Sequence, residues 1–196
     1  MKRLSEKLTG YIIKTGTVSE ELYAVYQYGF QIGLEMLCCF VICLSIAIYL
    51  HMIPEFIIFT GIFMLLRTYA GGVHLNSFFA CLICSVTVQN LILFIGSKWI
   101  LSTVTAWVII LISISLIWKC APVENVNREL DSNEKEHCKK VTMRILIGVF
   151  SFTFICTLCG VDKIVSLVAW TVLVILISQY IGVVKYKIEK SNDRRE

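Results

Sequence analysis

The sequence predicts an all-α integral membrane protein with about six transmembrane helices, preceded by amphipathic helices at the membrane surface. Hydrophobic residues make up 57% of the 196 residues and the mean hydropathy is +0.77. Only 16% of residues are charged, against about 25% in soluble domains. Apolar stretches of bilayer-spanning length recur along the chain. The basic residues fall almost entirely on one side of the resulting topology.

We expect a single membrane-embedded domain over residues 1–196, because the chain has no evident linker and no internal repeat. Residues 1–29 would form interfacial helices, residues 30–184 the transmembrane region and residues 185–196 a cytoplasmic tail. No cleavable signal peptide is expected, since no apolar stretch with a small-residue cleavage site closely follows the basic N-terminus.

Residues 2–14 are predicted to form an amphipathic helix on the membrane surface. Four apolar side chains share one face of this helix, namely Leu4, Leu8, Tyr11 and Ile12. Thr17 and Ser19 are candidate N-caps for a second interfacial helix that leads into the first span.

Six spans are expected, at residues 30–50, 53–67, 78–96, 99–118, 143–160 and 163–184. The second is short, and its helix is expected to start at Pro54 and to run on toward Ala70. If it does not cross the bilayer it is a re-entrant segment, and the topology changes. In the charged stretch 119–142, the run from Asp131 can cap a helix that continues into the fifth span.

The basic residues predict that both termini and residues 67–77 face the cytosol. Of the 18 Lys and Arg residues, all but Lys98 and Lys163 then lie on the cytosolic side. The formal net charge of +4 follows from this topology and calls for no nucleic-acid partner.

The segment Arg67-Thr-Tyr-Ala-Gly-Gly-Val-His74, followed seven residues later by Cys81, is the candidate catalytic site. It joins an imidazole and a thiol, the two groups that a cysteine protease needs. Asn76 or Ser77 can cap the third span, so Cys81 falls about one turn inside a helix N-terminus, where a thiolate is favoured. Seven residues of helix rise about 10 Å, so His74 has to fold back from a loop. Gly71 and Gly72 are expected to give that loop its freedom.

Two charged residues near this segment are candidates for supporting roles. Arg67 either clamps a substrate carboxylate or carbonyl, or is an interfacial arginine whose charged group reaches the membrane surface. Glu35 lies about as deep in the first span as Cys81 lies in the third. It either orients His74 or binds substrate, or it is a structural partner of Arg67 or of a backbone group.

Most of the other cysteines are interpreted as reduced packing residues. Cys81-Leu-Ile-Cys84 and Cys156-Thr-Leu-Cys159 match a redox spacing but lie in apolar helices. A zinc site at His74, Cys81 and Cys84 lacks a fourth ligand nearby in the sequence. We therefore expect no metal and no cofactor.

The sequence resembles the accessory gene regulator B (AgrB) family of membrane endopeptidases in Gram-positive quorum sensing. The resemblance lies in the spacing, after two spans, of Arg67, Gly71, Gly72, His74 and Cys81. The stretch Ala121-Pro122-Val123-Glu124-Asn125 through Asn127 and Arg128 is also similar to the family's segment after the fourth span. The sequence departs from the family at Glu129, where a proline is common. The resemblance covers essentially the whole chain.

This resemblance implies that Cys81 is the nucleophile and His74 its base, with Arg67 and Gly72 at family motif positions. The implied substrate is a short amphipathic propeptide of the AgrD type, cleaved after the future signal and cyclised to a thiolactone or lactone peptide. The resemblance also implies a homodimer. The competing interpretation is a non-enzymatic membrane scaffold or a small transporter. Against a transporter, the spans lack a matching pair of broken helices rich in Gly and Pro.

Overall fold

The computed structural model describes residues 2–16, 19, 22–73, 78–123 and 131–193. Of these described residues 88% are helical, and none of them forms a strand. The helices are α1 (Lys2–Lys14), α2 (Tyr23–Tyr49), α3 (Ile53–Ala70), α4 (Phe78–Lys98), α5 (Thr103–Cys120), α6 (Ser132–Leu158) and α7 (Asp162–Asp193).

The six helices α2 to α7 are each long and apolar enough to cross a membrane. The predicted fold class, an all-helical membrane protein with six spans, is therefore confirmed. Pro54 lies in the first turn of α3, where its missing N–H costs nothing. The helix continues to Ala70, as expected. Asp131 is the N-cap of α6, and its backbone N–H donates to Glu134 Oε2 at 3.2 Å, as in a capping box.

Several helix boundaries differ from those predicted. Residues 23–49 form one continuous helix, so no separate second interfacial helix is present in the described part of the N-terminal region. The glycines within this stretch lower helix propensity only modestly and do not interrupt it. The α5 helix begins at Thr103 after the N-cap Ser102, whose hydroxyl accepts from Thr105 N. The α7 helix runs beyond residue 184 to Asp193.

The chain divides into two compact units, each described by itself. The first comprises residues 1–51 and 76–88, and the second comprises residues 52–75 and 89–196. In the first unit, α1 packs along α2. Ser5 and Thr9, one turn apart on α1, are fully buried, while the apolar face carrying Leu4, Leu8 and Tyr11 is exposed. A helix is thus present where the first amphipathic helix is predicted, and its place on a membrane surface stays a prediction.

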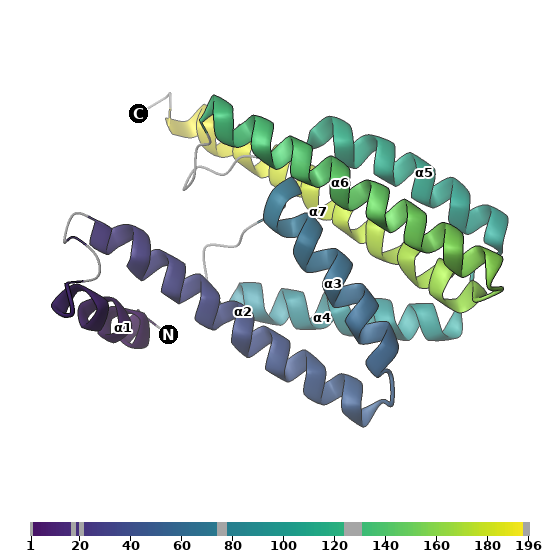
Figure 1. Cartoon of the computed structure of the whole chain (residues 1–196), viewed down its shortest axis with the longest axis horizontal. Helices are drawn as coiled ribbons and strands as arrows, with labels where there is room; N and C mark the ends of the chain where they lie inside the picture. Colours follow the sequence, from purple (N-terminus) through teal and green to yellow (C-terminus); the bar gives the residue numbers. More distant parts are fainter. Residues whose placement is uncertain (1, 17–18, 20–21, 74–77, 124–130, 194–196) are drawn as a thin grey trace. The chain divides into compact units, whose positions relative to one another are not determined.

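The second unit is built around α7, which contacts α3, α5 and α6. In Figure 1, α5, α6 and α7 run beside one another and α3 crosses them. The inner face of α7 is made of small and β-branched side chains that are almost fully buried, including Val165, Val168, Ala169, Val172 and Ile175. Small side chains let neighbouring helix backbones approach closely, as in membrane bundles generally.

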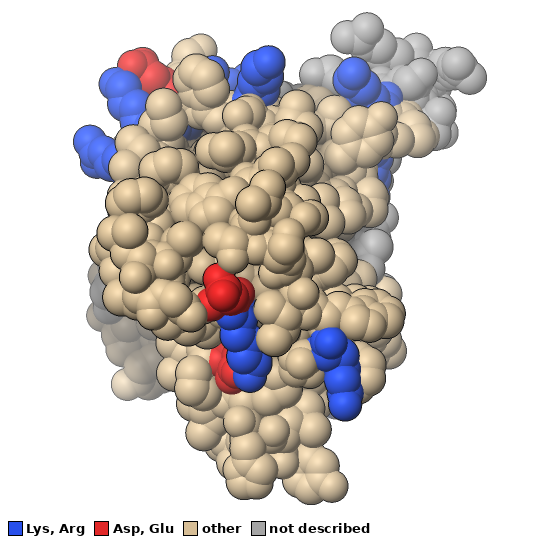
Figure 2. Space-filling model, turned by 90° about the vertical axis from the view of Figure 1, so that its right-hand side faces the viewer, with Lys and Arg blue, Asp and Glu red and all other residues tan. Residues whose placement is uncertain are grey.

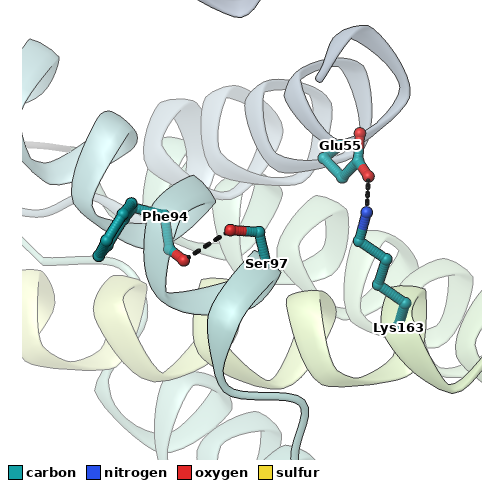
Figure 3. A network of polar contacts seen from close by, with 4 residues as sticks. All are labelled: Glu55, Phe94, Ser97 and Lys163. Carbon is teal, nitrogen blue, oxygen red and sulfur yellow. Dashed lines mark hydrogen bonds and ion pairs between the residues drawn. The ribbon is translucent and has the colours of Figure 1, made fainter. Parts of the chain in front are cut away.

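Polar contacts tie the second unit together where α3 and α7 begin. Lys163 Nζ donates to Glu55 Oε1 at 2.5 Å, and Thr103 Oγ1 donates to Asp162 Oδ1 at 2.8 Å. Figure 3 shows the Glu55–Lys163 pair beside the last turn of α4, in which the Ser97 hydroxyl donates to the Phe94 carbonyl. On the face shown in Figure 2, uncharged residues cover most of the surface and charged residues gather at a few places.

Candidate active site

Cys81 lies in the first turn of α4, three residues after the helix begins at Phe78. This agrees with the expected position about one turn inside the helix. The Cys81 side chain is partly exposed and the Cys84 side chain is exposed, and all nine cysteines of the chain are free thiols. His74 and the candidate N-caps Asn76 and Ser77 lie outside the described residues.

Arg67 lies in the last turn of α3 and is held by the chain itself. Its Nη1 donates to Ser178 Oγ on α7 at 3.0 Å, and its Nη2 donates to the backbone carbonyl of Val73. The guanidinium also lies 5.9 Å from the centroid of the Phe63 ring, within the range of a cation–π interaction. These contacts join the end of α3 to α7 and to Val73, and a supporting role of Arg67 at the catalytic site stays a prediction. A contact between Arg67 and substrate remains a prediction.

Gly71 ends α3 in a conformation that only glycine adopts without strain, with φ +80° and ψ −171°. A Cβ atom at this position would also lie 2.6 Å from the backbone oxygen of Val123. Val123 N in turn donates to the carbonyl of Ala70 at 3.0 Å. Gly71 therefore brings the end of α3 against the segment that follows α5.

Gly72 is buried and serves close packing instead of a special backbone angle. A Cβ atom there would lie 2.6 Å from Arg67 Nη1 and 3.0 Å from Ser178 Oγ. The two glycines are predicted to give the loop freedom, but the described part of the loop is held in place, because Val73 N donates to the carbonyl of Ser178 and the Val73 carbonyl accepts from Arg67 Nη2. We conclude that the glycines permit a tight fit.

Glu35 lies on α2 and is partly buried. Its Oε1 accepts a hydrogen bond from Gln31 Nε2, one turn earlier on the same helix, at 3.2 Å. Glu35 and Cys81 belong to the first unit, whereas Arg67 and the two glycines belong to the second. The structure thus brings Arg67, Gly71 and Gly72 together, and a role of Glu35 beside His74 and Cys81 stays a prediction.

The family model for accessory gene regulator B (AgrB) matches residues 5–182. The chain belongs to the AgrB family. Searches of curated proteins and of solved structures found no match. AgrB proteins take part in the processing of the agr quorum-sensing peptide and act on the AgrD propeptide in the membrane. Together with the six apolar helices, this identifies a multi-pass membrane protein.

The AgrB match includes the whole segment from Arg67 to Cys81 and extends into α7. Three residues of α7 that contact this segment were not predicted from the sequence. Ser178 accepts from Arg67, Gln179 Nε2 donates to the carbonyl of Ala70 at 3.0 Å, and Gly182 packs against Gly72. A signal was present, since Ser-Gln and a glycine one turn apart are unusual in an apolar span and mark it for a close helix contact.

No group of three or more His, Cys, Asp or Glu side chains that could hold a metal ion is found among the described residues. These residues are 2–73, apart from short gaps near the N-terminus, 78–123 and 131–193. The predicted zinc alternative includes His74, which lies outside these residues.

Proposed function

We propose that this protein is a membrane cysteine endopeptidase that removes the C-terminal tail of an AgrD-type propeptide and promotes its cyclisation. The observation that carries the proposal is the family match over residues 5–182, which includes both His74 and Cys81. The position of Cys81 in the first turn of α4 supports it further, because its side chain is partly exposed there, as a reactive cysteine has to be.

In the first step, His74 takes the proton of the Cys81 thiol, and the thiolate attacks the carbonyl carbon of the scissile peptide bond. The C–N bond then breaks, and His74 gives the proton to the leaving nitrogen. The products are a thioester between Cys81 and the N-terminal part of the propeptide, and a free tail with a new amino terminus.

In the second step, the thiol of a cysteine in the propeptide attacks the thioester and releases Cys81. A serine hydroxyl in that position would give a lactone instead of a thiolactone. Converting a peptide to a thioester is uphill, whereas exchanging one thioester for another is nearly balanced. The intermediate therefore has to be protected from water, which a site at the edge of the membrane assists.

Other residues have supporting roles in this proposal. Arg67, Gly71 and Gly72 hold the segment before His74, and Glu35 either orients His74 or contacts substrate. The amphipathic helix α1 binds the propeptide at the membrane surface. Both termini and residues 67–77 face the cytosol, and the protein acts as a homodimer.

The experiment that tests the proposal is turnover of the propeptide by purified protein in lipid vesicles. Cys81→Ala should abolish cleavage, and Cys81→Ser should lose turnover because a hydroxyl is far harder to deprotonate. His74→Ala should slow cleavage by a factor on the order of 10²–10⁴, the usual contribution of a general base. Cys84→Ala is the matched control and should stay active, because Cys84 lies one turn further along α4 and takes no part in the proposed reaction.

Cleavage that survives in Cys81→Ala would overturn the endopeptidase proposal. No cleavage by the purified wild-type protein would leave the alternative of a membrane scaffold or small transporter, with AgrD processing catalysed by another protein.

A further inference from the structure

The segment Gly72–Val73 lies in direct contact with one turn of α7. Val73 N donates to the backbone carbonyl of Ser178 at 3.1 Å, and the Ser178 hydroxyl accepts from Arg67 Nη1. Both Gly72 and Gly182 are buried. All these residues belong to the second unit, so this contact is defined within one compact body.

A donor that does not belong to a helix can reach a carbonyl oxygen in the middle of that helix only where no side chain covers the oxygen. In an α-helix the N–H four residues later takes one lone pair of each carbonyl oxygen, and the second lone pair is free to accept. The side chain four residues later normally covers this second direction, because Cα–Cβ bonds tilt toward the helix N-terminus. For the carbonyl of Ser178 that position is Gly182, which has no side chain.

The fit around Gly182 leaves no room for a methyl group. A Cβ atom there would lie 2.9 Å from the carbonyl carbon of Gly72, 3.1 Å from Val73 N and 3.3 Å from Gly72 O. All three are backbone atoms, which cannot rotate away as a flexible side chain would. A glycine in the middle of a helix lowers helix stability, so its presence at this contact is explained by the packing.

We infer that Gly182 and Ser178 form a notch in α7 that positions the backbone entering His74. Consecutive Cα atoms are 3.8 Å apart, so fixing Val73 fixes the point from which His74 starts. Gly182 and Ser178 are thus positioning residues, acting through the 71–73 segment without touching the reacting atoms. This inference rests on the proposed function of His74 as the base.

Gly182→Ala tests the notch, and Gly148→Ala on α6 is the matched control. Both place a methyl group in a long helix, but a Cβ atom at Gly148 meets nothing within 4 Å. For Gly182→Ala we expect kcat for propeptide cleavage to fall at least tenfold while KM changes less than threefold. The pH profile for alkylation of Cys81 by iodoacetamide should shift toward that of His74→Ala. Gly148→Ala should match the wild-type protein in all three measurements.

A second variant covers the possibility that Gly182→Ala does not fold. Ser178→Ala removes only the hydroxyl that accepts from Arg67 and leaves the backbone carbonyl in place, and we expect kcat to fall about tenfold at unchanged KM. If folded Gly182→Ala, or else Ser178→Ala, keeps kcat within twofold of wild type, the positioning role is wrong. If kcat falls but the alkylation profile stays at the wild-type pH, the notch does not act through His74, which equally refutes the inference.

These outcomes are distinct from failure of the proposed function. Cleavage by Cys81→Ala would remove the proposed function, and the positioning role with it. Inactive Cys81→Ala together with fully active Gly182→Ala would leave the endopeptidase standing and remove only the notch.

Discussion

Substituting Gly71 by alanine should destabilise the protein by more than the backbone conformation alone explains. The matched control is Gly160→Ala in the turn between α6 and α7. Both glycines have a positive φ, +80° at Gly71 and +71° at Gly160. A Cβ atom at Gly160 meets nothing within 4 Å, whereas at Gly71 it would lie 2.6 Å from the backbone oxygen of Val123.

A positive φ costs a non-glycine residue about 1–3 kcal/mol, with the upper end at Gly71, because its ψ of −171° lies in a region that essentially only glycine occupies. At Gly71 the Val123 backbone also has to move away, which breaks its 3.0 Å hydrogen bond to Ala70. Such a bond contributes about 1 kcal/mol to the free energy of unfolding. The loss of unfolded-state freedom from Gly to Ala is common to both variants and cancels between them. We therefore expect a loss of about 3–4 kcal/mol for Gly71→Ala and about 1–2 kcal/mol for Gly160→Ala.

The free energy of unfolding can be measured by SDS titration of protein in mixed micelles, followed by circular dichroism. Turnover should separate the variants further, since Gly71→Ala displaces the segment before His74 and Gly160→Ala does not. Equal stability losses, or full turnover by Gly71→Ala, would refute the packing explanation of this glycine.

Three further predictions concern other parts of the chain. A double-mutant cycle with Glu55→Gln and Lys163→Met should give a coupling energy of about 0.5–1 kcal/mol, near the top of the range for exposed pairs because the Glu55 side chain is only 12% exposed; no coupling would leave the pair without a stabilising role. Glu35→Gln keeps an acceptor for Gln31 and should slow acylation without lowering protein levels, and a normal cleavage rate would make Glu35 purely structural. An impermeant thiol reagent added outside intact cells, with the native cysteines replaced, should label Ser102→Cys but not Asn76→Cys, and labelling of Asn76→Cys would reverse the topology.

The membrane-spanning helices could be predicted from the sequence because bilayer thickness dictates their length. Pro54 and Asp131 gave correct local signals, since the missing N–H of proline and the carboxylate of an N-cap act within one turn of the chain. The continuity of α2 differs from the prediction, because Thr17 and Ser19 suit the start of a short interfacial helix but no strong helix breaker separates residues 23–49.

The packing of the helices could not be predicted in the same way. In a membrane both the lipid-facing and the protein-facing sides of a helix are apolar, so hydropathy does not identify which face of α7 meets α3. Ser178 lies 111 residues after Arg67 in the sequence, and nothing local links them. The candidate residues Arg67, Gly71 and Gly72 were found from their motif, but the tight fit that holds them depends on this distant helix.

The measurement that tests the central claim most directly is mass spectrometry of the enzyme incubated with a propeptide whose ring-closing cysteine is replaced by alanine. The second step is then blocked, so the N-terminal fragment should accumulate as a thioester on Cys81 or be hydrolysed slowly. Peptide mapping should find the adduct at Cys81, with the other eight cysteines unmodified, and hydroxylamine should release it. Two results would contradict the role of Cys81 as the nucleophile. One is cleavage that leaves no adduct on the wild-type protein and is unimpaired in Cys81→Ala, and the other is an adduct on another cysteine.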